Sequence, residues 1–353
     1  MKEIRVELGD RSYSIWVQPG LLDKVGFLLP RASSVAIVTD SNVAPLFAQR
    51  VKYSIGKCGR SVGVITIAPG DDHKNAQTLE AIYEGMFDLG LDRGSIVAAL
   101  GGGVVGDAAG YAAATFMRGI GYVQVPTTLL ADVDSSVGGK TGINHPRGKN
   151  MIGAFHQPLA VFIDPAALLT LPPGEVCAGM AEVIKYGVIR DSDFLRYLEG
   201  HVADVRALQA GAIEHVISTC CKIKADVVRA DEREGGERAI LNYGHTLGHA
   251  LEALTGYTRY RHGEAVAIGM NLAARIAEKM GMVDAEFVRR QARLLQSYGL
   301  PTDPGIADAA RVADLLRGDK KARGGRVRFV LPVAFGKVVV CDDVPDEIIR
   351  GLF

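Results

Sequence analysis

The chain has 353 residues, of which 48% are hydrophobic and 23% are charged, as in a globular protein of one large or two smaller domains. Lysine plus arginine and aspartate plus glutamate both number 40, so the formal net charge is zero, which excludes non-specific attraction to nucleic acid or to an anionic membrane. The five cysteines lack paired Cys-x-x-Cys spacing and the N-terminus lacks a signal-peptide core, so a cytoplasmic protein without a membrane partner is expected.

The first half of the chain alternates strands with helices. A hairpin is expected where Gly9-Asp10 separates two strand-like runs, and helical patterns begin at Val43 and cover Asn75–Leu89. The alternation predicts an α/β domain over residues 1–164, with a mainly parallel, Rossmann-like sheet. The expected strands are Ile4–Leu8, Tyr13–Val17, Val35–Thr39, Val62–Ile67, Ile96–Leu100 and Tyr122–Val125.

Helical periodicity dominates beyond Asp164-Pro165. A short strand pair, Val327–Leu331 with Lys337–Cys341, follows near the C-terminus. This half is predicted to be a mostly α-helical domain over residues 165–353, with a ligand cleft between the two halves. The expected helices are Pro173–Val188, Phe194–Leu198, Ala207–Val228, Leu241–Leu254, Glu264–Met280, Ala285–Tyr298 and Ala307–Leu316.

Histidines cluster at one corner of this helical half. Asn242, His245 and His249 are spaced i, i+3 and i+7, so they share one face of the expected helix, and His262 opens the next helix. Histidine is the commonest metal ligand in proteins. The cluster therefore favours a metal site over the alternative of satisfied polar side chains on a half-buried face.

A carboxylate elsewhere in the helical half completes a ligand set. Glu182 lies within the apolar stretch Ala178–Val188, where a buried charge needs a partner. With two of the histidines it makes three protein ligands and leaves a position for water or substrate, which is the pattern of catalytic zinc. The alternative is an ordinary helical pair with Lys185, three residues further on.

A glycine turn follows the strand Ile96–Leu100. Gly101, Gly103 and Gly106 satisfy Gly-x-Gly-x-x-Gly between a strand and a helix, the context in which this motif binds a dinucleotide. Glycine lets the backbone approach a pyrophosphate, and the helix N-terminus offers free N–H groups. The acid usual about 20 residues later is missing, so a structural turn remains the alternative.

Other polar side chains follow neighbouring strands, where α/β sheets bind ligands. They are expected at one edge of the sheet, although helix capping is an alternative for each. These residues are Asp40, Asn42, Asp71, Lys74, Thr127 and Thr128.

Anion-binding candidates lie in both halves. A glycine-rich loop from Asp134 to Asn150 carries Lys140 and Lys149 and is suited to wrapping a phosphate or a carboxylate, or is a surface turn. Arg238 lies four residues before Asn242 and shares its expected face.

Together these motifs resemble the 3-dehydroquinate synthase family, within the sugar-phosphate cyclases. The resemblance runs from Asp40 to Lys321 and implies an NAD-binding α/β domain, a helical metal-binding domain and an active site between them. Its most specific segments are Gly101–Asp107, Pro126–Asn144, Gly148–Pro158, Ala178–Gly187, Asp231–Glu234, Asn242–Glu252 and His262–Met270.

The resemblance also implies a role for individual residues. The metal ligands would be Glu182, His245 and His262. NAD contacts would fall on Asp40, Asn42, Asp71, Lys74, Gly102, Gly103, Val105, Asp107, Thr127 and Thr128. Catalytic contacts would fall on Lys140, Lys185, Lys224, Arg238, Asn242 and His249, and substrate contacts on Asp134, Lys149, Asn150, Arg118 and one of Lys320 or Lys321.

The family departs from this sequence at three positions. It usually has Glu in place of Asp71, Arg in place of Gly174 and Leu in place of Arg261. None of these differences removes a residue type that the chemistry needs.

The activity implied is conversion of 3-deoxy-D-arabino-heptulosonate 7-phosphate, a phosphorylated sugar acid, into 3-dehydroquinate and phosphate, a step of the shikimate pathway to aromatic amino acids. NAD and one divalent metal, zinc or cobalt, would assist. Arg118 matches an arginine that reaches the neighbouring subunit's site, which implies a homodimer. The alternatives are another sugar-phosphate cyclase, an oxidoreductase resembling metal-dependent glycerol dehydrogenases, and a non-catalytic binder of NAD or a sugar phosphate.

Overall fold

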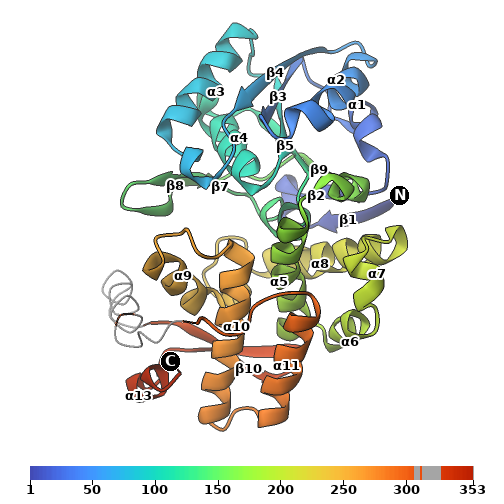
Figure 1. The fold of residues 1–353 in the computed structure, drawn as a ribbon. Helices are drawn as coiled ribbons and strands as arrows, with labels where there is room; N and C mark the ends of the chain where they lie inside the picture. Colours follow the sequence, from blue (N-terminus) through green and yellow to red (C-terminus); the bar gives the residue numbers. More distant parts are fainter. Residues whose placement is uncertain (306–310, 312–326, 353) are drawn as a thin grey trace. The chain divides into compact units, whose positions relative to one another are not determined.

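The computed structural model describes residues 1–305, 311 and 327–352 (Figure 1). It divides into two compact units. The first unit is Met1–Pro172 with Ile213–Arg233, and the second is Pro173–Ala212 with Glu234–Phe353. A single boundary at Asp164 does not anticipate the return of residues 213–233 to the first unit. Lys320 and Lys321 lie outside the described residues, as does most of the expected helix Ala307–Leu316.

The first unit is built on a seven-stranded sheet in the order β1-β2-β9-β6-β5-β3-β4. Only β1 and β2 pair antiparallel, through the expected hairpin; every other neighbouring pair in this sheet is parallel. The predicted mainly parallel, Rossmann-like sheet is therefore confirmed. The strands are β1 (Lys2–Val6), β2 (Tyr13–Val17), β3 (Ser34–Asp40), β4 (Ser61–Ile67), β5 (Ile96–Gly101), β6 (Gly121–Pro126) and β9 (Ala160–Ile163).

Helices cover both faces of this sheet, α1 and α2 on one side, α3 and α4 on the other (Figure 1). Because side chains alternate along a strand, Val35 and Ile37 of β3 enter one core, whereas Ala36 and Val38 enter the other. The helices are α1 (Val25–Leu28), α2 (Gln49–Gly56), α3 (Ala76–Asp88) and α4 (Gly103–Thr115), and most of α8 (Ala210–Ala230) also belongs to this unit.

The segment expected to be a glycine-rich loop instead forms a second, two-stranded sheet. Strands β7 (Lys140–His145) and β8 (Gly148–Phe155) pair antiparallel. Gly142 lies opposite Gly153, and a Cβ at either position would overlap the backbone of the partner strand. Glycine lowers strand propensity in sequence, but here it permits a close approach that no other residue allows.

The second unit is mostly helical, as expected. Its central helix, α10 (His262–Lys279), packs against α5 (Pro173–Ile189), α9 (His245–Leu254), α11 (Ala285–Ser297) and β10 (Phe329–Ala334). No described helix in either unit has the length and apolarity needed to cross a membrane. The remaining elements are α6 (Ser192–Gly200), α7 (Val202–Arg206), β11 (Lys337–Cys341) and α13 (Asp346–Arg350).

Two glycines bring the helices around α10 into backbone contact. A Cβ on Gly263 would overlap the carbonyl oxygen of Ala178 in α5. A Cβ on Gly269 would overlap the carbonyl oxygen of Gly244, immediately before α9. The spacing of α5, α9 and α10 is thus set by main chain against main chain, which fixes the positions of the side chains at their ends.

Candidate functional site

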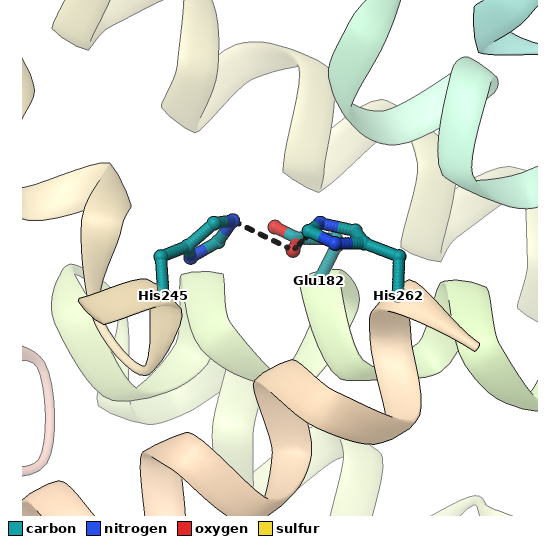
Figure 2. Close-up of side chains that lie close together, drawn as sticks. All are labelled: Glu182, His245 and His262. Atoms are coloured by element: carbon teal, nitrogen blue, oxygen red, sulfur yellow. Dashed lines mark ion pairs between the residues drawn. The ribbon is translucent and has the colours of Figure 1, made fainter. Parts of the chain in front are cut away.

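Glu182, His245 and His262 converge in the second unit (Figure 2). Glu182 lies in α5, and the two histidines are the first residues of α9 and α10. The Nε2 atoms of His245 and His262 lie 3.4 Å and 4.0 Å from Oε1 of Glu182. One ligand atom from each residue falls within 4.8 Å of the others, as three ligands of one ion must.

The start of α9 differs from the expected helix. Gly244 adopts a left-handed conformation with φ 82°, so α9 begins at His245 rather than at Leu241. Asn242 instead ends the 3-10 turn Glu237–Asn242 and donates from Nδ2 to Oε1 of Glu234 at 2.9 Å. Asn242 and His245 therefore do not share one continuous helical face, and the expectation that they do is wrong.

The carboxylate of Glu182 is suited to a cation. The side chain is fully buried and pairs with the Lys185 ammonium, and no other group in the described part of the chain donates a hydrogen bond to its oxygens. One ammonium leaves other lone pairs of this buried carboxylate without a donor, which is costly, and a coordinated ion would satisfy them. The donor set of one carboxylate and two imidazoles fits a divalent transition metal.

The two histidines differ electrostatically. Burial and the neighbouring Lys185 hold the pKa of His245 well below its usual range, so the imidazole stays neutral, the form that binds metal. Desolvation lowers the pKa of His262, but contact with Glu252 and the charge of Glu182 outweigh it, leaving this pKa above its usual value. Metal binding at pH values below this pKa therefore releases a proton from His262.

Two further predicted residues of the second unit, His249 and Lys185, lie beside this cluster. The ring centroid of His249 is 5.4 Å from that of His245 and 5.8 Å from that of His262. Arg238 is 2% exposed within the turn that precedes α9. The Lys185 ammonium forms an ion pair with the carboxylate of Glu182.

In the first unit, the predicted nucleotide residues follow four adjacent parallel strands, β4, β3, β5 and β6. The N-cap of α4 is Gly102, which provides no side-chain cap, so the N–H groups of the first turn are open to a ligand. A Cβ on Gly102 or on Gly103 would lie 3.1 Å from the side chain of Thr128 or Ser135, respectively. This glycine cradle fits a pyrophosphate. Asp40 also serves its own turn, because Oδ1 accepts from the backbone N–H of Asn42 at 2.8 Å.

Lys74 links the nucleotide residues to the β7–β8 hairpin. Its side chain is 4% exposed, and Nζ donates to Oδ2 of Asp107 and to Oδ1 of Asn150, both at 2.5 Å. Burial raises the pKa of Asp107, and the Lys74 charge opposes that rise. The predicted Lys149 also pairs with Asp71, at 3.0 Å.

Asn144, one of the two amides of the glycine-rich segment that was expected to wrap an anion, connects Asp71, Lys74 and Asn150 through hydrogen bonds. Its backbone N–H donates to the Lys74 carbonyl at 2.7 Å, and Nδ2 donates to the Asp71 carbonyl at 3.1 Å. Oδ1 accepts from the backbone N–H of Asn150 at 2.9 Å. The sequence indicated that this amide belongs to the loop, but not which residues it contacts.

The other predicted residues of the first unit differ in their surroundings: some pair with each other, and others are exposed. Lys224 of α8 donates from Nζ to Oδ1 of Asp134 at 2.7 Å, whereas Lys140 is exposed at the start of β7. Arg118 is exposed just beyond the C-terminal end of α4, roughly 20 Å along that helix from Gly103. The structure therefore does not bring Arg118 to the glycine cradle of its own chain.

Asp132 is a buried carboxylate that received no role from the sequence. It is 1% exposed, and no group among the residues that the structure describes hydrogen-bonds to either side-chain oxygen. Burial, together with the nearby Asp164 charge, raises the pKa of Asp132 well above its usual range. The folded protein therefore holds this carboxyl in its protonated form at pH values where the unfolded chain has lost the proton.

Asp132→Asn is expected to gain stability relative to the parent as pH rises. The unfolded pKa is about 3.9, so the parent loses up to about 1.4 kcal/mol of unfolding free energy per pH unit between that value and the folded-state pKa. Below pH 4 the carboxyl is protonated in both states and the loss vanishes. Urea unfolding at pH 5, 6 and 7 measures the difference. A difference independent of pH would contradict the assignment.

Comparisons with known proteins agree with one another. Residues 64–178 match the family 3-dehydroquinate synthase N-terminal, and residues 179–322 match 3-dehydroquinate synthase C-terminal. A 3-dehydroquinate synthase of Desulforamulus reducens is 51% identical over 350 residues, covering 98% of each chain.

Solved structures of related cyclases resemble the whole chain. A 2-deoxy-scyllo-inosose synthase, complexed with carbaglucose-6-phosphate, NAD+ and Co2+, is 29% identical with a TM-score of 0.90, covering 99% of each chain. The 2-epi-5-epi-valiolone synthase of Streptomyces hygroscopicus, with NAD+ and Zn2+ bound, is 27% identical with a TM-score of 0.89, covering 98% of this chain and 97% of that one. On the family matches and the full-length identity, the chain belongs to the 3-dehydroquinate synthase family.

Proposed function

We propose that this protein converts 3-deoxy-D-arabino-heptulosonate 7-phosphate into 3-dehydroquinate and phosphate, as a phosphate-eliminating lyase of the shikimate pathway that uses NAD and one divalent metal. The observation that carries the proposal is the convergence of two imidazoles on the buried carboxylate of Glu182, beside the Lys185 ammonium. The 51% identity to a 3-dehydroquinate synthase favours this reaction over the other cyclases, at 27% and 29%.

Glu182, His245 and His262 would hold the metal, zinc or cobalt. A bound divalent ion supplies a Lewis acid that lowers the pKa of a coordinated substrate hydroxyl. His245 presents Nε2 without a proton because its pKa is depressed and its Nδ1 faces the Tyr243 carbonyl at 3.2 Å. The Lys185 ammonium lies buried beside the carboxylate, and we propose that it binds an anionic group of the substrate.

NAD would be held at the carboxyl edge of the parallel sheet. Bound NAD supplies a hydride acceptor that is restored within the same cycle. The N–H groups at the start of α4 would bind its pyrophosphate, and Lys74 orients Asp107 and Asn150 beside them. The remaining proposed contacts are Asp40, Asn42, Asp71, Gly102, Gly103, Val105, Thr127 and Thr128.

The basic residues would hold the phosphate and the carboxylate of the substrate. A chain of zero net charge needs particular basic residues to bind an anionic substrate, and a glycerol-dehydrogenase-like oxidoreductase does not. Asp134 fixes the ammonium of Lys224, and we propose the same substrate role for Asn150, Asn242 and His249. The cationic set is Lys140, Lys149, Lys185, Lys224, Arg238 and one of Lys320 or Lys321.

We also propose a cytoplasmic homodimer. Arg118 lies far along α4 from the glycine cradle of its own chain, as expected of a residue that serves a neighbouring subunit. The five cysteines are free thiols, which suits a reducing compartment.

Phosphate release from the heptulosonate phosphate tests the function. Release is expected only with NAD+ and metal present, without accumulation of NADH, because the hydride returns to the product. Preincubation with a chelator should abolish release, and added Zn2+ or Co2+ should restore it. Steady NADH formation, measured at 340 nm as absorbance, would instead favour an oxidoreductase, and binding without turnover would favour a non-catalytic protein.

A further inference from the structure

Both histidines of the cluster are engaged on the side away from Glu182. Nδ1 of His245 lies 3.2 Å from the carbonyl oxygen of Tyr243. Nδ1 of His262 lies 3.5 Å from Oε2 of Glu252. In each ring Nε2 faces Glu182, whereas Nδ1 faces a different oxygen, which can accept a hydrogen bond from it.

The acceptor on His262 is unusual in its burial. Glu252 is 4% exposed and lies in α9, seven residues after His245. It reaches His262 because α9 and α10 approach closely at Gly248, where a Cβ would lie 3.0 Å from the Ala265 carbonyl oxygen. Burying a carboxylate is costly unless a neighbouring group pairs with its charge. The neighbouring group here is His262, a proposed metal ligand.

We propose that Glu252 is a positioning residue for His262: its carboxylate accepts a hydrogen bond from Nδ1–H and so fixes the tautomer that directs the Nε2 lone pair toward Glu182. This inference rests on the proposed metal centre. A carboxylate acceptor makes the imidazole a more basic ligand than a backbone carbonyl does, and partners of this kind raise metal affinity about 10- to 100-fold. The two histidines are thus unequal ligands, His262 being the stronger donor.

One competing interpretation uses the same residues. Ligand atoms of His249, Glu252 and His262 also lie within 4.8 Å of one another, a geometry open to a second ion. The positioning role requires one ion per chain, whereas the second site requires two. The shared His262 and the orientation of its Nε2 atom toward Glu182 favour the positioning role.

The test is metal affinity, with Co2+ as the probe, in Glu252→Gln and Glu252→Asp. Glutamine can present an NH2 group to Nδ1 and favour the wrong tautomer, and aspartate keeps the charge but is one methylene short. We expect a dissociation constant raised about 10- to 100-fold in Glu252→Gln, and less in Glu252→Asp, with one ion per chain in the parent. The cobalt absorption bands should shift, while the NAD+ dissociation constant should not.

Glu278→Gln, on the same helix as His262, is the matched control and should bind Co2+ as the parent does. Thermal melting of each variant without metal separates misfolding from lost affinity, and Glu252→Asp serves if the glutamine variant does not fold. An affinity for Co2+ within twofold of the parent, or two ions per chain, would overturn the proposal. Tight Co2+ binding without phosphate release would overturn the proposed function alone and leave this role intact.

Discussion

Glu182→Gln is expected to slow phosphate release by about 10³-fold, the largest effect of any single change considered. Lewis-acid assistance is worth several kcal/mol, and each step of about 1.4 kcal/mol changes a rate tenfold. Glutamine keeps the shape of the side chain but removes the charge that both the ion and Lys185 require. Phosphate release and Co2+ binding, measured on the same preparation, should fall together.

The matched control is Glu175→Gln, in the first turn of the same helix. Glu175 is exposed and pairs with Arg261 at the surface, so its loss should change the rate less than twofold. Thermal melting separates lost chemistry from lost fold, because Glu182→Gln also leaves the buried Lys185 ammonium without its partner. A folded Glu182→Gln protein with the parent's affinity for Co2+ would remove the basis of the proposed mechanism.

Lys74→Met is expected to destabilise the protein by about 3 kcal/mol, because breaking a buried pair from one side leaves the carboxylate of Asp107 without its counter-charge. Lys74 is also a proposed NAD contact, so we expect the NAD+ dissociation constant to rise about tenfold, the cost of one lost charge-assisted hydrogen bond. Urea unfolding measures the first effect and calorimetric titration with NAD+ the second.

A double variant separates the two consequences. Lys74→Met with Asp107→Asn removes both charges and should recover most of the lost stability, since neither partner is then stranded. NAD+ binding should stay weak. Lys52→Met, on the exposed surface of α2, should leave both quantities unchanged. Recovery of NAD+ binding in the double variant would show that Lys74 acts only through folding.

Most strands of the sheet were predictable because each is a distinct apolar run in the sequence. β2 begins and ends at the predicted residues, and β3 to β6 do so within a residue, since buried β-branched runs are bounded by polar turns. β9 was passed over because its four residues are too short a run to distinguish from a turn. Yet β9 lies between β2 and β6, so the order of the sheet could not be derived without it.

The helical half was predictable in content but less so in detail. Gly244 sits inside a helical pattern, and an isolated glycine there gives no sign of whether the helix continues or restarts. Its left-handed conformation moves the helix start to His245. The β7–β8 hairpin was also missed, because its glycines predict a loop when each segment is considered alone. Glycine is favoured there only because the two strands pair closely, which the sequence of one strand does not reveal.

The candidate metal centre was predictable as a set of residue types, not as a geometry. Spacing alone left open which two histidines accompany Glu182, and the family resemblance selected His245 and His262. The structure brings that same pair to the carboxylate. The contacts of Glu252 and Asn144 were not predicted, because they join residues that periodicity does not relate.

The glycines of α10 carry a consequence for anyone wishing to redesign this protein. Gly263 lies against the Ala178 carbonyl and Gly269 against the Gly244 carbonyl, with no side chain between them. A smaller side chain therefore cannot be substituted there to bring these helices closer together. Directed evolution toward roomier substrates must therefore reshape the polar lining contributed by other segments. We expect the spacing of α5, α9 and α10, which carry the three proposed metal ligands, to stay the same in such variants.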